Sequence, residues 1–501
     1  MTDSPSASTA RATARFGFGL RPGEAARIGA DGRAWLLDQI ARPGSALLSD
    51  PRLASSADAV AALNAYREQQ DAERRAAGRG PAPDRRDPPD RGNRAAPMTG
   101  DQPMAPAAPE PRPAFQPPRR LQALLFADSE ARVHRAVTTG DGFSERWVQF
   151  WSNHFTVAAR SLPTLPWPGV FEREAVRPRV FGRFADLLKA SVLHPGMLVY
   201  LDQHQSVGPG SQLAQRAARR AGPDRDPPGL NENLAREVLE LHTIGAQAGY
   251  GQADVTEFAR ALTGWTVPVA PRLQRLARDA TPGSAVFIDA LHEPGQRTLL
   301  GRSWRETGAG QATAILDHLA SHPATAGRIA LKVARHFVAD EPPPALVTRL
   351  EADFRRSGGD LASLARTLVT SPEAIEPEAR KFKTPNDFLV SSLRAAGVTD
   401  LPRAELRATF EQLGQIPYRA PSPRGWADTA SEWAAPDAVL KRAEWAQLVA
   451  GLLPAGTDPS AFATGNLGPA LTARTATALR RAGSARQAIS LFLMSPEFQR
   501  R

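Results

Sequence analysis

Residues 309–338, with the sequence AGQATAILDHLASHPATAGRIALKVARHFV, show the pattern on which the fold prediction rests. This stretch predicts two helices, over residues 309–320 and 323–338, that meet at His322-Pro323. Proline suits the first position of a helix, because the N–H that it lacks would have no partner there. Further helices are predicted downstream, over residues 344–356, 359–370, 385–396, 403–414, 437–452, 468–481 and 485–494. A mainly α fold is therefore expected.

The chain before this stretch is also mainly helical. Residues 9–41 predict two short helices around the turn at Gly17–Gly23, and residues 55–75 predict a longer one. Helical patterns recur at residues 121–139, 143–158, 171–192, 231–245 and 254–262. The expected architecture is a large multi-helix body with one small β-hairpin.

Three segments interrupt the helical pattern. Residues 76–119 contain twelve prolines and bury too little apolar surface to offset their ordering entropy, so they predict a disordered Pro/Arg-rich insert. Residues 205–229 predict a flexible loop, and residues 286–301 predict a hairpin with its turn at Pro294-Gly295. The predicted divisions are an N-terminal helical segment (1–75), the insert (76–119) and a main helical domain (120–501).

The charge balance is basic, with 62 Lys and Arg against 52 Asp and Glu and a formal net charge of +10. Only five of the basic residues are Lys, and the Arg excess accompanies abundant Ala, Gly and Pro. This composition is typical of a GC-rich genome rather than of selection for phosphate binding. No basic block alternates with aromatic residues as a single-strand binding surface requires, so nucleic-acid binding is not expected.

The sequence lacks the residues and motifs that several classes of chemistry require. The chain has no Cys, which excludes disulfides, thiolate metal sites and cysteine nucleophiles. Phosphate-loop, dinucleotide-binding, nucleophile-elbow and His-Glu-x-x-His motifs are absent too. The first 18 residues lack the apolar core of a secretion signal, and no run of about 18 apolar residues occurs. The sequence as written predicts a cytoplasmic protein without a membrane span; a mis-called start codon would leave a periplasmic or exported location open.

The predicted helix 231–245 carries the first candidate catalytic residues. At about 100° per residue, Asn233, Glu237 and Glu240 fall within a stripe of roughly 60°, where they could bind a metal or transfer a proton. His242 lies roughly 140° around an α-helix from Glu237, so the two cannot share an ion unless the helix frays. The structural alternative is an ordinary network in which Arg236 pairs with Glu232 or Glu240.

Candidate metal ligands are His154, Asp202 and His242. His154 follows an aromatic run, which should keep its imidazole neutral and able to bind a metal or to act as a base. Asp202 ends a predicted helix, where the helix dipole disfavours a carboxylate and a cationic partner is expected. The alternative for His154 is a core histidine with both nitrogens hydrogen-bonded.

Three further histidines are candidates for substrate or anion binding. His194 and His322 each precede a proline, which predicts that each caps a helix; helix N-termini also attract anions. His292 lies in the predicted hairpin turn as a lid or edge residue. His134, His204, His318 and His336 have no distinctive setting and are interpreted as surface or core residues.

Taken in order, several strings resemble one bacterial family. They are FWSNHF (150–155), HPGML (194–198), NENLAREVLELHTIG (231–245), ALTGW (261–265), HEPG (292–295), HPATA (322–326) and SPEF (495–498). The chain resembles the domain-of-unknown-function 1800 family from about Thr13 to Arg501, and departs from its pattern at Glu293, where Asp is usual. The resemblance implies no established activity. It implies that relatives are often exported and often encoded beside a sulfatase-like protein, a candidate partner.

Two hypotheses follow. The first is a metal-assisted hydrolase in which His154, Asp202, Asn233, Glu237 and His242 line one pocket around a divalent metal, and a carboxylate acts as base on a bound water. The second is a non-enzymatic helical accessory or scaffold protein that assists export or maturation of the sulfatase-like partner. Convergence of these side chains on one cavity would favour the first, and their dispersal among structural partners would favour the second.

Overall fold

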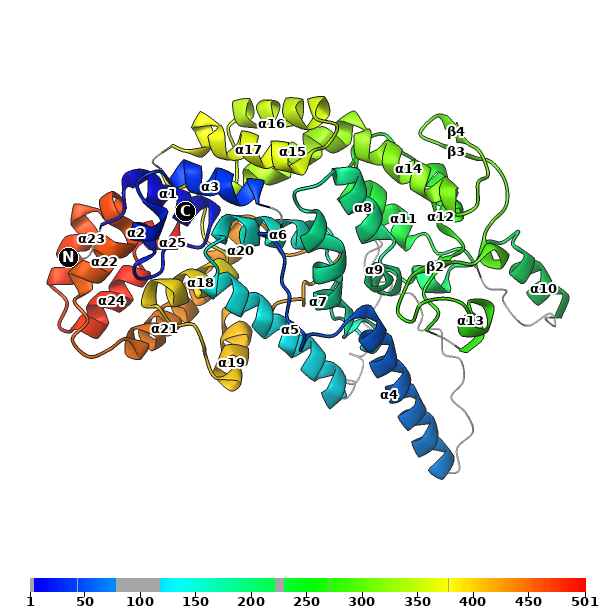
Figure 1. The fold of residues 1–501 in the computed structure, drawn as a ribbon, viewed down its shortest axis with the longest axis horizontal. Helices are drawn as coiled ribbons and strands as arrows, with labels where there is room; N and C mark the ends of the chain where they lie inside the picture. The colour runs from blue at the N-terminus through cyan, green and yellow to red at the C-terminus, as the bar shows by residue number, and fades with distance from the viewer. Residues whose placement is uncertain (1–3, 43, 78–117, 221–228, 270, 377) are drawn as a thin grey trace, which may run out of the picture.

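The computed structural model describes residues 4–42, 44–77, 118–220, 229–269, 271–376 and 378–501. The predicted disordered insert (76–119) falls almost entirely on residues 78–117, which lie outside the described residues. Within the described chain, helices α1 to α25 account for nearly all regular structure, beside two antiparallel sheets of two strands each (Figure 1). The predicted mainly α fold is confirmed.

The stretch that decided the prediction forms α14 (Ala309–Ser321) and α15 (Pro323–Phe337), which pack with α16 (Pro344–Arg356) and α17 (Leu361–Thr370) along one side of the molecule (Figure 1). His322 caps α15 as predicted, since its Nδ1 accepts the N–H of Ala324 at 3.2 Å. These four helices pack with α8 (Phe184–Val192) and α3 (Gly32–Ala41), the same body that carries the candidate site.

The remaining helices are α1 (Ala7–Phe16), α2 (Glu24–Ile28), α4 (Ser56–Ala76), α5 (Arg119–Thr138), α6 (Gly142–His154), α7 (Trp167–Phe171), α9 (Pro195–Tyr200), α10 (Gln212–Arg220), α11 (Asn233–Glu237), α12 (Gln252–Leu262), α13 (Pro271–Leu276), α18 (Pro385–Ala396), α19 (Arg403–Leu413), α20 (Ala430–Trp433), α21 (Pro436–Leu452), α22 (Pro459–Leu467), α23 (Ala473–Arg480), α24 (Ala485–Leu493) and α25 (Pro496–Gln499). The part of the predicted loop 205–229 that is described contains α10, so a helix stands where we expected flexible chain.

Two hydrophobic cores hold these helices together. The larger core runs from Phe16 through the aromatic side chains of α6 to α17, and it includes residues of the N-terminal segment. The second core lies among α18, α19 and α21 to α25, the gold to red group at one end of Figure 1. Phe18 and the end of α5, with Val133, belong to this second core, so the N-terminal region and α5 connect the two.

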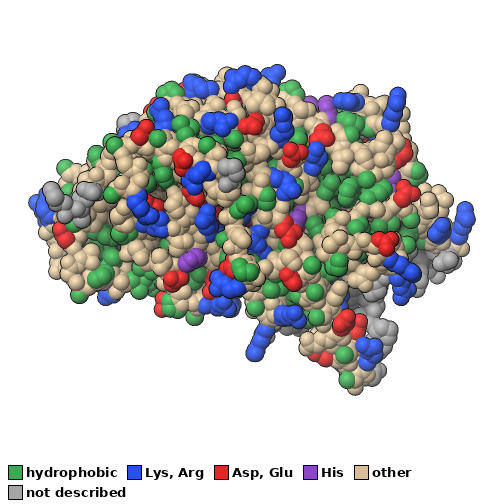
Figure 2. All heavy atoms as spheres, viewed as in Figure 1, with side chains coloured by type: hydrophobic (Ala, Val, Ile, Leu, Met, Phe, Trp, Pro, Cys, Tyr) green, Lys and Arg blue, Asp and Glu red, His purple; other side chains and the backbone are tan. Residues whose placement is uncertain are grey.

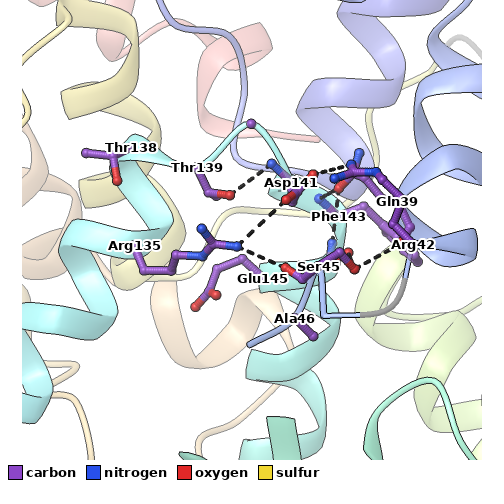
Figure 3. A network of polar contacts seen from close by, with 12 residues as sticks. Gln39, Arg42, Ser45, Ala46, Arg135, Thr138, Thr139, Asp141, Phe143 and Glu145 are labelled. Atoms are coloured by element: carbon purple, nitrogen blue, oxygen red, sulfur yellow. Dashed lines mark hydrogen bonds and ion pairs between the residues drawn. The ribbon is translucent and has the colours of Figure 1, made fainter. Parts of the chain in front are cut away.

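A polar network ties the N-terminal helices to the start of α6 (Figure 3). The Gln39 side chain of α3 accepts the N–H groups of Phe143 (2.9 Å) and Ser144 (3.3 Å). These groups lie in the first turn of α6, where no carbonyl of the same helix can accept them. Asp141, just before α6, pairs with Arg42 and with Arg135 of α5 (3.7 Å). A side chain from another helix thus supplies the cap that α6 lacks in its own sequence.

The predicted hairpin 286–301 is wrong in its pairing. β2 (Val286–Phe287) pairs with β1 (Trp265–Thr266), whereas β3 (Arg297–Leu299) pairs with β4 (Arg302–Trp304). The tight turn is Leu300-Gly301, both with positive φ (51° and 70°), which suits the twist of a two-residue hairpin loop. Pro294-Gly295 is a turn between the two sheets rather than within one.

The surface drawn in Figure 2 mixes Lys and Arg with acidic and apolar side chains, without a continuous basic band. Among the described helices, none combines the length and apolar character needed to cross a membrane.

Candidate functional site

A polar stripe on α15 organises the candidate site. Arg328, Lys332 and His336 are four residues apart, which places them on one face of the helix. Opposite this face lie the C-terminal half of α6, the turn Val238–His242 and the loop 417–428, as their contacts with the stripe show. Segments distant in sequence therefore meet along one helix.

His336 and Asp428 form the centre of the site. His336 Nδ1 lies 3.0 Å from Asp428 Oδ1, and His336 Nε2 is buried without a hydrogen-bond partner in the described chain. Burial lowers the pKa of His336 to about 4, although Asp428 opposes the shift. Burial alone would raise the pKa of Asp428, but the hydrogen bond from His336 and the charges of His336, Lys332 and Lys381 lower it to about 2. At neutral pH the pair is a neutral imidazole oriented by a carboxylate.

A polar cavity of about 60 Å³ adjoins this pair, with room for a few water molecules or one small ligand group. Its lining comes from α5, α6, α15 and the segments 384–387 and 415–428: Arg132, Arg146, Gln149, Asn153, His336, Thr384, Asn386, Asp387, Gln415, Pro417, Trp426, Ala427 and Asp428. Eleven of these thirteen side chains can hydrogen-bond, so the cavity suits a polar ligand rather than an apolar one.

The cavity lining holds two guanidinium groups, Arg132 and Arg146, and two carboxylates, Asp387 and Asp428, and further basic groups lie behind it. Asp387 faces Arg146 (Nη1–Oδ1 3.0 Å) and Arg501 (Nε–Oδ2 3.2 Å). Burial would raise the pKa of the Asp387 carboxyl, but these two guanidinium groups hold it well below its ordinary value. Lys332 and Lys381 add positive charge beside Asp428. This balance favours an anionic ligand.

Asn153, in the FWSNHF string, holds the loop that carries Asp428. Its Nδ2 donates to the carbonyl of Trp426 (2.9 Å), and its Oδ1 accepts the N–H of Trp426 (2.7 Å). Gly425 makes this approach possible, because its φ is +84° and a Cβ there would lie 2.5 Å from the Asn153 carbonyl oxygen.

Of the three predicted catalytic residues on this helix, Glu237 and Glu240 influence each other, whereas Asn233 is exposed. Glu237 is half-buried, and burial together with Glu240 raises its pKa to about 7, while Arg236 and Arg424 oppose the shift. Asn233 is exposed, and its N–H donates to the side chain of Asn231 (2.9 Å). Arg236 pairs with Glu232 (3.3 Å), as the structural alternative predicted. None of the three candidates lines the cavity beside His336.

The helix predicted over 231–245 is not α-helical throughout. α11 ends at Glu237 and continues as a π-helical turn, Val238–His242. A π turn contains one residue more than an α turn, so the side chains that follow are rotated by about 100° from α-helical positions. The predicted 140° offset between Glu237 and His242 therefore does not apply. His242 is fully buried beside His154, with ring centroids 6.1 Å apart.

Two of the predicted metal ligands have other contacts in the described chain, and metal binding by His154, Asp202 and His242 stays a prediction. His154 Nε2 bonds the carbonyl of His242 (3.1 Å), and Asp202 lies in a left-handed turn after α9, where its carbonyl accepts a hydrogen bond from Asn231 (3.3 Å). Across the described residues there is no group of three His, Asp or Glu side chains placed to hold a metal ion. Besides burial, Lys332 and Arg328 lower the pKa of both histidines, to about 3 for His242. A metal cation would meet the same two positive charges.

The three histidines predicted to bind anions have structural partners. His194 caps α9, as predicted, by accepting the N–H of Gly196 at its Nδ1 (3.0 Å), and its Nε2 lies 3.3 Å from Glu174. His292 lies between the Thr263 carbonyl (2.8 Å) and Glu306 (3.2 Å). Neither these two nor His322 lines the cavity, and their role in anion binding stays a prediction.

Sequence reasoning missed the central pair. His336 was interpreted as a surface or core residue, and Asp428, Arg146 and Asp387 were not considered. One signal was available: α15 is apolar on most of its surface, yet Arg328, Lys332 and His336 recur at a spacing of four. No local pattern indicated that Asp428, which lies in a loop 92 residues away, would pair with His336.

Comparisons with known proteins give one match. The model of the family described as "Protein of unknown function (DUF1800)" matches residues 11–500. No curated protein and no solved structure matches the chain.

Proposed function

The chain belongs to the DUF1800 family, as its motifs predicted, and from that premise we propose that it is a hydrolase of small anionic esters that uses His336 and Asp428 as its general base. The observation that carries the proposal is the Nδ1 contact to Asp428, combined with a buried, unpartnered Nε2 beside a polar cavity.

The chemistry follows from the two ring nitrogens. A hydrogen bond from Nδ1–H to Asp428 leaves the Nε2 lone pair as the basic site. This nitrogen accepts a proton from a water in the cavity as that water attacks the ester, and Asp428 stabilises the resulting imidazolium. The departing group takes the proton back, which leaves an acid and an alcohol. Positioned proton transfer of this kind contributes a factor of about 10² to 10⁴ in rate.

The arginine pair at Asp387 suggests the charge of the substrate. Asp387 is one carboxylate that faces two guanidinium groups, Arg146 and Arg501. A further anion bound beside them would therefore find a positive partner. A negatively charged ester therefore suits the cavity better than a neutral one. We assign the base to His336, because Asp428 contacts its Nδ1 and its Nε2 has no hydrogen-bond partner in the described chain.

The test is a panel of chromogenic phosphate, sulfate and carboxylate esters, assayed with the parent protein, His336→Gln and Asp428→Asn. We expect turnover of an anionic ester that falls about a hundredfold or more in His336→Gln. His318→Gln is the matched control, because His318 lies on α14, outside the cavity. Equal rates in the parent and His336→Gln would overturn the proposal.

The alternative function is the non-enzymatic accessory protein, with a sulfatase-like partner. The observation that favours it is the structural use of several predicted site residues: His194 and His322 cap helices, and His292 contacts Glu306. Retention of the chain by an immobilised sulfatase-like protein, together with no turnover across the panel, would support this alternative.

A further inference from the structure

The cavity of the candidate site can hold only part of an ester. Its volume is about 60 Å³, enough for one small group, so the remainder of a substrate must lie outside it. Arg146 and Asp387 line the cavity and are buried. Trp426, Asn386 and Gln415 line it too but stay partly exposed, and we call these three residues the rim. The part of the substrate that the cavity cannot hold therefore contacts the rim.

Trp426 gives the rim an aromatic surface that is held in place. Its backbone bonds the Asn153 side chain (2.7 and 2.9 Å), and its ring centroid lies 5.9 Å from that of Trp433. Trp433 is fixed in turn, since its Nε1 donates to the carbonyl of Ala427 (2.9 Å). A partly exposed indole that is already ordered offers an apolar face with little loss of conformational freedom on binding.

The two amides of the rim leave one acceptor and one donor for a ligand. Asn386 Nδ2 donates to Gln149 Oε1 (2.9 Å), and Gln415 Oε1 accepts the N–H of Asn386 (2.8 Å). The opposite ends of these amides, Asn386 Oδ1 and Gln415 Nε2, bond no described residue. A hydroxyl both donates and accepts, so this pair of amides suits a ligand that carries several hydroxyls.

Arg132 supplies an open guanidinium for the charged end of the ligand. Its Nε lies 3.1 Å from Glu172, and its guanidinium carbon lies 5.1 Å from the centroid of the Tyr418 ring. These contacts fix the arginine in the cavity lining, while its two terminal nitrogens bond no described residue. A guanidinium whose terminal N–H groups are open pairs well with the oxygens of a phosphate or a sulfate.

We propose that the substrate is a phosphate or sulfate ester of a sugar, with its charged group in the cavity against Arg132 and its ring stacked on Trp426. This inference rests on the proposed ester hydrolysis and adds the class of the alcohol. A sugar ring presents C–H groups on its faces and hydroxyls around its edge, so it uses the indole and the two amides together. An aryl alcohol would use only the indole, and a short-chain alcohol only the amides.

The test measures binding rather than turnover. The 6-phosphate and 6-sulfate of glucose, and the phosphate and sulfate esters of glycerol, are titrated into the full chain by calorimetry. The titrations use the parent protein and His336→Gln, in which hydrolysis is expected to be lost. We expect one glucose ester to bind at least about fivefold more tightly than the glycerol ester of the same acid. The phosphate and sulfate arms decide which charged group the cavity takes.

The rim is tested with tryptophan variants. Trp426→Ala should remove the advantage of the glucose ester and leave binding of the glycerol ester unchanged, whereas Trp426→Phe should keep most of it because a ring remains. Trp265→Ala is the matched control, since this partly exposed indole packs against Phe287 and does not line the cavity. The comparison of the two alcohols in the parent protein needs no variant, so the test survives if Trp426→Ala folds poorly.

Equal affinities for the glucose and glycerol esters, or no binding by any of them, would overturn the proposal. An equal loss of both ligands in a folded Trp426→Ala would overturn it too. Glucose esters that bind but are not hydrolysed would leave the sugar site standing and overturn the proposed hydrolysis. Turnover of a chromogenic anionic ester, with equal affinities for the two alcohols, would do the reverse.

Discussion

Asn153 and Trp426 exchange two hydrogen bonds, Asn153 Nδ2 to the Trp426 carbonyl at 2.9 Å and the Trp426 N–H to Asn153 Oδ1 at 2.7 Å. The asparagine amide thus bonds the loop much as one peptide group bonds another across a pair of strands. Trp426 lies two residues before Asp428, so the end of α6 sets the position of the carboxylate that orients His336. This contact gives the motif around residue 153 a structural reason.

Asn153→Ala removes both bonds and leaves the Trp426 backbone groups without these partners. We expect the free energy of unfolding to fall by about 1–3 kcal/mol, measured by urea denaturation. His336 should also lose its fixed partner, so the catalytic rate on any anionic ester should fall with it. Asn466→Ala, which removes only an amide bonded within α22, should be milder. Equal losses in the two variants would contradict the assigned role.

Gly425→Ala introduces a Cβ that would lie 2.5 Å from the Asn153 carbonyl oxygen and 2.6 Å from its Oδ1, at a φ of +84°. We expect a loss of stability above the 1 kcal/mol or so that a left-handed Ala costs by itself. Gly414→Ala separates the two effects, because Gly414 has a φ of +80° but nothing within 4 Å of a Cβ. A thermal melt of both variants measures the difference, and identical shifts would show that the loop can move away.

His242 should make stability depend on pH. Burial lowers its folded pKa to about 3, below its ordinary value near 6.5, so between these values the unfolded chain binds more protons. Stability should therefore fall as the pH drops from about 6.5 towards 3. His242→Phe removes the titrating group without breaking a hydrogen bond, because neither ring nitrogen has a partner. It should flatten the slope by roughly 1 kcal/mol per pH unit, about the value that linkage assigns to one proton.

Urea unfolding at several pH values tests this slope. His134→Phe is the control, since the His134 side chain is 55% exposed and its replacement leaves the buried imidazoles in place. An unchanged slope in His242→Phe would mean that His242 finds hydrogen-bond partners in solution.

Arg177 joins two buried carboxylates, Glu145 (2.8 Å) and Glu172 (2.7 Å), directly after a second π turn, Glu172–Val176. Arg177→Met would leave both carboxylates without this counter-charge, at a cost of about 3–5 kcal/mol. Adding Glu145→Gln should restore part of the loss, as a double-mutant cycle in denaturant would show. Arg179→Met, nearby at the surface, should cost far less. Equal costs for the two arginines would contradict the network.

Local sequence was sufficient wherever the stabilising contacts are local. α16 and α18 have the bounds that their patterns predicted, and His194 and His322 cap helices as their His-Pro pairs indicated. The family was also evident from short motifs such as FWSNHF (150–155) and NENLAREVLELHTIG (231–245). In all these cases the information lies within a few residues of chain.

The failures share a different cause. The strands at 286–287 and 297–299 do not pair with each other: the first pairs with β1 and the second with β4. The tight turn is at Leu300-Gly301, whereas the sequence pattern had placed it at Pro294-Gly295. The π turn at Val238–His242 lies where the helix packs against α6 and α15, and no local pattern marked the extra residue.

The candidate site shows the same division. The sequence alone determined most of the helices, the two His-Pro caps, the family and the residues able to carry chemistry, since periodicity and capping act over three or four residues. Only the tertiary structure decided that His336 meets Asp428, that His242 lies beside His154 and that Trp426 lies at the rim of the cavity. These outcomes depend on burial and on charges brought together from distant segments, and such long-range energies leave no mark in the local order of residues.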